Sequence, residues 1–213
     1  RLKIAPGADL AQPTTHVTGD QALFDARCLQ SPSFGTRGIG RFALAALVAV
    51  RQALPDTQIV LLIDRSLEIL PPDIAGECEQ ITRVTQQDAS RFGVLIQPSP
   101  MTADPRPLLP ILHGEAHKVA VVFDFIPAHY PSVYLTHPAA RAEYAACLDA
   151  LALFDEFLCI SQDTEQEMLE WLSTYDRQPG SYSTSVAWPE EITSATHGRR
   201  PPPSEREKGT GPI

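Results

Sequence analysis

The chain has 213 residues, of which 43% are hydrophobic and 20% charged, and its 17 basic and 26 acidic residues give a net charge of −9. This length suits one large domain or two small ones. The acidic balance argues against a nucleic-acid-binding module and against a surface that attaches to anionic lipid. The longest apolar runs have the length of strands, far below the roughly 20 residues that cross a bilayer. We therefore expect a soluble, cytoplasmic protein with one hydrophobic core.

Short apolar runs alternate with helical segments along the chain. The predicted strands are residues 21–26, 58–64, 93–97, 118–123, 157–160 and 183–188. The predicted helices are residues 41–54, 138–153 and about 161–175. Because parallel strands need crossover connections, this order predicts an α/β, Rossmann-like fold, with a mostly parallel sheet and helices on both faces. Ligands of such sheets bind beyond the carboxyl ends of the strands.

Residues 1–20 and 193–213 are polar and lack any hydrophobic period, so we interpret them as linkers on either side of a domain at 21–192. Five prolines within residues 98–110 indicate either a stiff surface loop or a loop that borders a substrate site.

The four cysteines lie far apart and form no C-x-x-C pair, which favours reduced, buried thiols over disulfides or a zinc site. His113 and His117 are four residues apart, but Pro110 and Gly114 favour a loop there. A metal site is therefore not expected.

A glycine-rich segment, Arg37-Gly38-Ile39-Gly40-Arg41, lies between the first predicted strand and the first predicted helix. Glycines let a backbone approach a bulky ligand, and the amides of a helix start attract anions. The alternative is a turn that needs glycine only for its backbone geometry. The order of glycines is not that of the dinucleotide-binding fingerprint.

Asp124 directly follows a predicted strand, where a carboxylate would either orient a substrate hydroxyl or act as a base, or else cap the next loop. Asp64 ends another apolar run and is the strongest feature in favour of a nucleotide-cofactor oxidoreductase.

Four segments together resemble the N-terminal domain of glycosyltransferase family 4. They are residues 25–30 (DARCLQ), 37–42 (RGIGRF), 123–127 (FDFIP) with 130–131 (YP), and 159–161 (CIS). The resemblance covers about residues 21–190. It implies half of a GT-B fold, in which two Rossmann-like domains face each other across a cleft and transfer a sugar from a nucleotide donor with retention of configuration.

The resemblance also implies roles for individual residues. Gly38, Ile39 and Gly40, with Arg41, match the loop that approaches the donor diphosphate and the transferred sugar. Asp124 matches a catalytic aspartate near the acceptor, and the remaining acceptor-side positions are Arg37, Pro127 and Tyr130. Phe123 stands where some members have histidine, which places that histidine's role in doubt here.

The family's donor site lies mainly in a second domain with two glutamates eight positions apart, and no such pair occurs in this chain. We therefore expect an acceptor-side domain of a metal-independent hexosyltransferase in polysaccharide or glycoconjugate assembly, inactive by itself. Its partners would be a GDP- or UDP-hexose donor, a glycan acceptor and the C-terminal domain, with no resident cofactor. The alternatives are a non-catalytic binding domain and, after it, the oxidoreductase.

Overall fold

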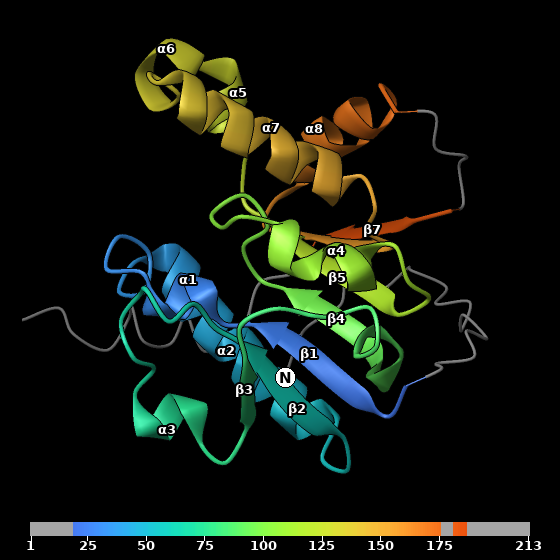
Figure 1. Ribbon diagram of the computed structural model, residues 1–213. Helices are drawn as coiled ribbons and strands as arrows, with labels where there is room; N and C mark the ends of the chain where they lie inside the picture. The colour runs from blue at the N-terminus through green and yellow to red at the C-terminus, as the bar shows by residue number, and fades with distance from the viewer. Residues whose placement is uncertain (1–18, 176–180, 187–213) are drawn as a thin grey trace, which may run out of the picture.

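The computed structural model describes residues 19–175 and 181–186. Within them, seven strands form one sheet in the order β3-β2-β1-β4-β5-β6-β7, and every neighbouring pair is parallel (Figure 1). The strands are β1 (Gln21–Asp25), β2 (Gln58–Leu62), β3 (Glu79–Ile81), β4 (Phe92–Gln97), β5 (His117–Val122), β6 (Glu156–Cys159) and β7 (Ser183–Val186). The predicted α/β, Rossmann-like fold is confirmed.

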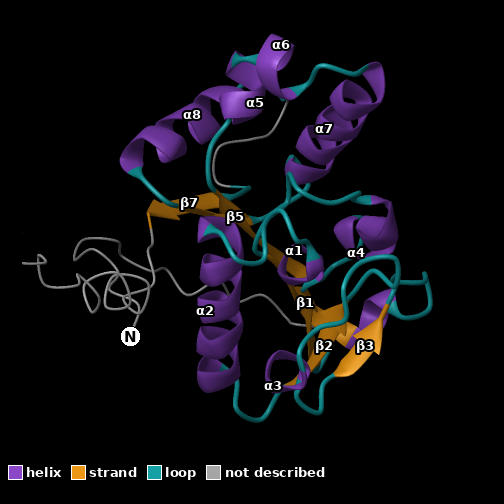
Figure 2. Cartoon of the chain, turned by 90° about the vertical axis from the view of Figure 1, so that its left-hand side faces the viewer, coloured by secondary structure: helices purple, strands orange, loops and turns teal. Residues whose placement is uncertain are grey.

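Apolar residues on both faces of the sheet explain why the strands lack alternation with polar residues. Along β1, Leu23 belongs to one buried cluster, whereas Ala22 and Phe24 belong to another that includes Leu47 of α2 (Gly38–Ala53). Successive side chains of a strand point to opposite faces, so each strand contributes to both clusters. Figure 2 shows α2 on one side of the sheet and α4 (Leu109–Leu112) on the other.

The remaining helices follow the strands in sequence. They are α1 (Arg27–Gln30), α3 (Pro72–Ala75), α5 (Ile126–His129), α6 (Pro131–Tyr134), α7 (Pro138–Leu151) and α8 (Gln162–Leu172), with 3-10 turns at Ala89–Arg91 and Arg106–Leu108. No helix within the described residues is long and apolar enough to cross a membrane.

The three predicted helices are present with shifted ends. α2 starts at Gly38 and not at residue 41, so the glycine-rich segment forms the first helical turn. α8 starts after Ser161, whose Oγ accepts a hydrogen bond from the Thr164 amide at 3.1 Å, as expected for an N-cap.

Several elements were not predicted. β3 has three residues and two of them are Glu79 and Gln80, so its sequence carries no apolar run. The proline-rich segment 98–110 is more than a stiff surface loop, because Ser99, Pro100 and Leu108 are buried and its end enters α4. Residues 1–18 of the proposed linker at 1–20, the whole of the proposed linker at 193–213, and the end of the last predicted strand at 187–188 lie outside the described residues.

Candidate functional site

The direction in which strands are added to the sheet reverses between β1 and β4. From β1 the chain builds β2 and β3 outward on one side, and from β4 it builds the other four strands outward on the opposite side. The loops that leave β1 and β4 therefore diverge, and they leave a crevice between them at the carboxyl edge. This is the position in the fold at which a ligand is expected.

A pocket of about 290 Å³ lies at this edge. The segment after β1 contributes Phe34 and Ile39, the loop after β4 contributes Ser99 and Thr102, and the segment after β5 contributes Asp124. Its volume is at the lower end of the range of roughly 300–1,000 Å³ found for small-molecule sites. These three segments, together with residues of α6 and α7, thus build one compact pocket.

Asp124 lines the pocket and is half-buried. Its Oδ1 accepts a hydrogen bond from the Ile126 amide at 3.0 Å, which ties down the turn into α5. Its Oδ2 has no hydrogen-bond partner within the described residues. The carboxylate therefore caps the next loop, as one of the two interpretations predicts, and still keeps one oxygen free for a ligand.

The residue before it is held on two sides. The Phe123 ring packs edge-on against Phe42 of α2, with centroids 5.4 Å apart. Its carbonyl oxygen accepts a hydrogen bond from Thr164 Oγ1 at 3.0 Å, which joins the end of β5 to the start of α8. These contacts limit the freedom of the backbone that carries Asp124.

Tyr144 lines the pocket from α7 and is 8% exposed, yet its hydroxyl makes no hydrogen bond within the described residues. Burial and the nearby Asp124 carboxylate raise the pKa of Tyr144 to about 12. The nearby Ala128 amide lowers this pKa. The amide donates its own hydrogen bond to the Phe125 carbonyl oxygen at 2.8 Å, so it does not serve as a partner of the Tyr144 hydroxyl. A buried hydroxyl without a partner is unusual and costs stability.

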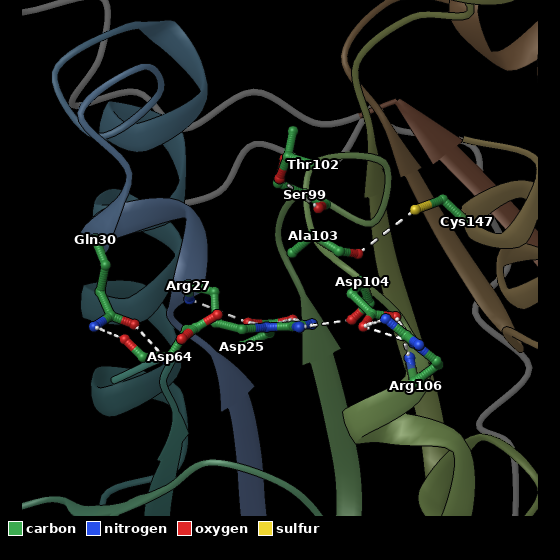
Figure 3. Close-up of polar contacts among 10 residues, drawn as sticks. All are labelled: Asp25, Arg27, Gln30, Asp64, Ser99, Thr102, Ala103, Asp104, Arg106 and Cys147. Atoms are coloured by element: carbon green, nitrogen blue, oxygen red, sulfur yellow. Dashed lines mark hydrogen bonds and ion pairs between the residues drawn. The ribbon is translucent and has the colours of Figure 1, made fainter. Parts of the chain in front are cut away.

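A buried ion pair lies at the end of β1 (Figure 3). The guanidinium of Arg27 donates to both carboxylate oxygens of Asp25, with a shortest distance of 2.6 Å. Burial disfavours the charged guanidinium, but Asp25, together with Asp104 and Asp64, outweighs this effect and raises the pKa of Arg27. The same guanidinium donates to the Asp104 carbonyl oxygen at 2.6 Å, while Cys147 Sγ of α7 contacts the Ala103 carbonyl oxygen at 3.5 Å. The loop that carries Ser99 and Thr102 is therefore held from both sides.

The two glycines of the glycine-rich segment 37–41 differ in how closely other atoms pack around them. A side chain at Gly40 would collide with the backbone of Gly35, so this glycine is required for packing. Nothing lies within 4 Å of the position that a Cβ of Gly38 would take, so Gly38 is free of any packing demand. Arg37 and Arg41 are exposed. The alternative interpretation, a turn that needs glycine for geometry, thus holds for Gly40 and leaves Gly38 available to a ligand.

Of the residues predicted for the site, the structure brings together Ile39, Asp124 and Pro127, which all line the pocket. The others do not line it; they are Arg37, Gly38, Gly40, Arg41 and Tyr130. Sequence reasoning missed Tyr144, Ser99 and Thr102. The prolines around Ser99 and Thr102 indicated a loop at the site, but no sequence signal singled out Tyr144 on its helix.

The other candidates have structural roles. Asp64 Oδ1 accepts hydrogen bonds from the Ser66 hydroxyl at 2.7 Å and amide at 2.8 Å, which lower the pKa of Asp64. His117 pairs with Glu156 of β6 at 3.1 Å, and His113 follows α4. No cluster of three metal-ligating side chains occurs within residues 19–175 and 181–186. None of the four cysteines is paired in a disulfide; Cys28, Cys147 and Cys159 are buried as predicted, whereas Cys78 is only half-buried.

Comparisons with protein-family models, with curated proteins and with solved structures find no match for this chain.

Proposed function

We propose that this chain is the N-terminal, acceptor-side domain of a retaining glycosyltransferase with the GT-B fold, which transfers a sugar from a nucleotide-sugar donor to a glycan or glycoconjugate. The observation that carries the proposal is that Ile39 and Asp124 line one pocket at the carboxyl edge of a parallel sheet. The family resemblance assigns Ile39 to the donor loop and Asp124 to the acceptor side. Their meeting in one pocket is what a transfer between donor and acceptor requires.

In this proposal Asp124 orients the acceptor. Its Oδ2 accepts a hydrogen bond from the acceptor hydroxyl, and Oδ1 stays on the Ile126 amide and holds the carboxylate in place. The acceptor oxygen then forms a bond to the anomeric carbon as the bond from that carbon to the diphosphate breaks. The hydroxyl proton leaves with a phosphate oxygen of the nucleoside diphosphate. Holding the two reactants in this geometry is the main contribution of the domain.

The start of α2 faces the donor in the same proposal. The first amides of a helix have no acceptor within the helix, and the helix dipole favours an anion there. In α2 the Gly40 amide donates to the Phe34 carbonyl oxygen at 3.1 Å, which leaves the amides of Gly38 and Ile39 for a ligand. Gly38 leaves open space above these amides, and the exposed Arg37 and Arg41 add positive charge. Within the described residues no lysine, arginine or histidine lines the pocket, so most of the charge on the leaving diphosphate would be neutralised by groups of a second domain.

The test is a transfer assay with a panel of nucleotide sugars. It compares this chain with a longer product that includes whatever its gene encodes on either side. We expect transfer by the longer product and little or none by this chain. Asp124→Asn should lower kcat by about 100-fold or more, without lowering the unfolding temperature. Glu77→Gln, which removes an exposed carboxylate at the far edge of the sheet, is the control. Equal transfer by both products, or full activity of the Asp124→Asn variant, would refute the proposal.

A non-catalytic binding domain is the second candidate, because the pocket is formed by the described residues alone. It predicts small-molecule binding by this chain and no transfer by any longer product. The oxidoreductase alternative needs Asp64 for a cofactor ribose. Asp64 does not line the pocket, so this alternative ranks last. Tight binding of a nicotinamide dinucleotide to this chain would restore it.

A further inference from the structure

The pocket is mostly apolar. Apart from Ser99, Thr102 and Asp124, every residue that lines it is aliphatic or aromatic, or is proline or methionine. The aromatic residues come from the segments after β1 and β5 and from α6 and α7, so apolar surface surrounds the cavity from several directions. A ligand that fills this volume must itself offer mainly apolar surface, because buried polar groups without partners cost free energy.

Two of the three polar residues are already occupied with each other. Thr102 Oγ1 lies 2.7 Å from Ser99 Oγ and 3.0 Å from the Ser99 carbonyl oxygen. The Tyr144 hydroxyl, which can donate or accept, has no hydrogen-bond partner within the described residues, and neither has Asp124 Oδ2. Asp124 Oδ2 accepts hydrogen bonds and donates none when ionised, so the ligand must supply a donor at this point.

The charge of the pocket excludes further ligand classes. An anionic ligand would meet a carboxylate, and within the described residues no cationic side chain lines the pocket. A hexose ring bound inside would leave most of its hydroxyls unpaired, and each buried polar group without a partner weakens binding. The cavity thus disfavours both anions and free sugars.

We propose that the pocket binds a neutral, largely apolar ring compound whose single hydroxyl donates to Asp124. This rests on the proposed function in one respect, since it makes that hydroxyl the acceptor and the apolar ring the aglycone of a glycoconjugate.

The surface next to the pocket agrees with this ligand class. Tyr134 lines the cavity and is 56% exposed. Exposed, largely apolar side chains also lie on α5 and α6 and between them: Ile126 at 42%, Tyr130 at 60% and Val133 at 66%. The apolar wall therefore continues outward from the cavity. A ligand larger than the cavity would extend its apolar part along these helices.

The experiment measures direct binding to the full 213-residue chain by calorimetry at about pH 7, without any donor. Three probes carry the same naphthalene ring with a neutral, an anionic or a cationic group: 2-naphthol, 2-naphthoate and 2-naphthylmethylammonium. The fourth probe is a sugar, methyl glucoside. We expect 2-naphthol to bind at least about 10-fold more tightly than 2-naphthoate and methyl glucoside, because a good buried hydrogen bond without an unpaired charge is worth about 1.4 kcal/mol. We also expect it to bind more tightly than the ammonium probe, because desolvation of the cation in the apolar pocket offsets its attraction to Asp124.

Two variants test the assignment of the pocket. Asp124→Asn should weaken 2-naphthol by about 10-fold, and Glu77→Gln should leave it unchanged. Met101→Glu places a second carboxylate in the apolar wall. It should weaken the binding of 2-naphthol and strengthen the binding of the ammonium probe. This variant keeps the test valid if Asp124→Asn lowers the stability of the protein.

Several results would overturn the inference. They are tighter binding of 2-naphthylmethylammonium, which would assign an organic cation, tighter binding of 2-naphthoate, and no binding by any probe at millimolar concentration. Tighter binding of methyl glucoside would overturn the ligand class and leave the glycosyl-transfer proposal standing. Tight binding of 2-naphthol with no transfer from any nucleotide sugar would refute the transferase and keep the ligand class.

Discussion

The ion pair between Asp25 and Arg27 is the most consequential polar contact at the carboxyl edge. Their side chains are 3% and 4% exposed, and Arg27 also holds the Asp104 carbonyl oxygen. Arg27→Met keeps most of the volume but leaves Asp25 buried without its partner. Breaking a buried pair in this way costs about 3–5 kcal/mol. For a chain of this size, the unfolding temperature should fall by about 10 °C, at roughly 2–4 °C for each kcal/mol.

Urea unfolding followed by circular dichroism measures this cost, and a double-mutant cycle separates its causes. Asp25→Asn removes the charge that Arg27→Met leaves unpaired. The double variant should therefore recover part of the loss, with a coupling energy of about 2 kcal/mol. The matched control is Arg106→Met, because Arg106 is 80% exposed and its pair with Asp104 faces solvent. It should leave the unfolding free energy almost unchanged. Equal losses for the two arginine variants would show that burial of the pair does not determine its contribution.

Further predictions concern the pocket wall, the start of α2 and the other end of the sheet. Tyr144→Phe should leave the unfolding free energy unchanged or raise it by about 1 kcal/mol, because it removes a buried hydroxyl that has no partner; a loss of that size would mean that the hydroxyl is bonded. Gly40→Ala should lower the unfolding free energy by about 1–3 kcal/mol through overpacking. Gly38→Ala should change the unfolding free energy little and should instead lower the rate of transfer. Equal stabilities of the two variants would refute this contrast. The hydrogen bond that His117 Nε2 donates to the Glu156 carboxylate raises the pKa of His117 above its ordinary value of 6.5. The stabilisation from this pair is therefore present below that value and is lost as the pH rises through the raised pKa. His117→Gln should therefore reduce the difference in unfolding free energy between about pH 6 and about pH 8, by less than about 1 kcal/mol.

The sequence alone was sufficient for most of the sheet. Runs such as residues 58–64 are apolar throughout because both faces of the sheet are buried, and this signal is local. β3 was missed because Glu79 and Gln80 lie in a three-residue edge strand. It is recognised only by its pairing with β2, and such pairing joins residues distant in the chain.

The candidate site was likewise predictable from the sequence only in part. Asp124 was predicted because a carboxylate directly after an apolar strand is visible in the sequence, and Ile39 because it lies between glycines. The order of the strands decided that these two residues share a pocket and that Tyr144 joins them from a helix. The burial of the pair between Asp25 and Arg27 was likewise decided by tertiary structure, since opposite charges two residues apart are usually found on a solvated surface. Local composition thus determined which segments become strands and helices, while long-range packing determined which side chains meet, because those contacts depend on groups that the sequence places far apart.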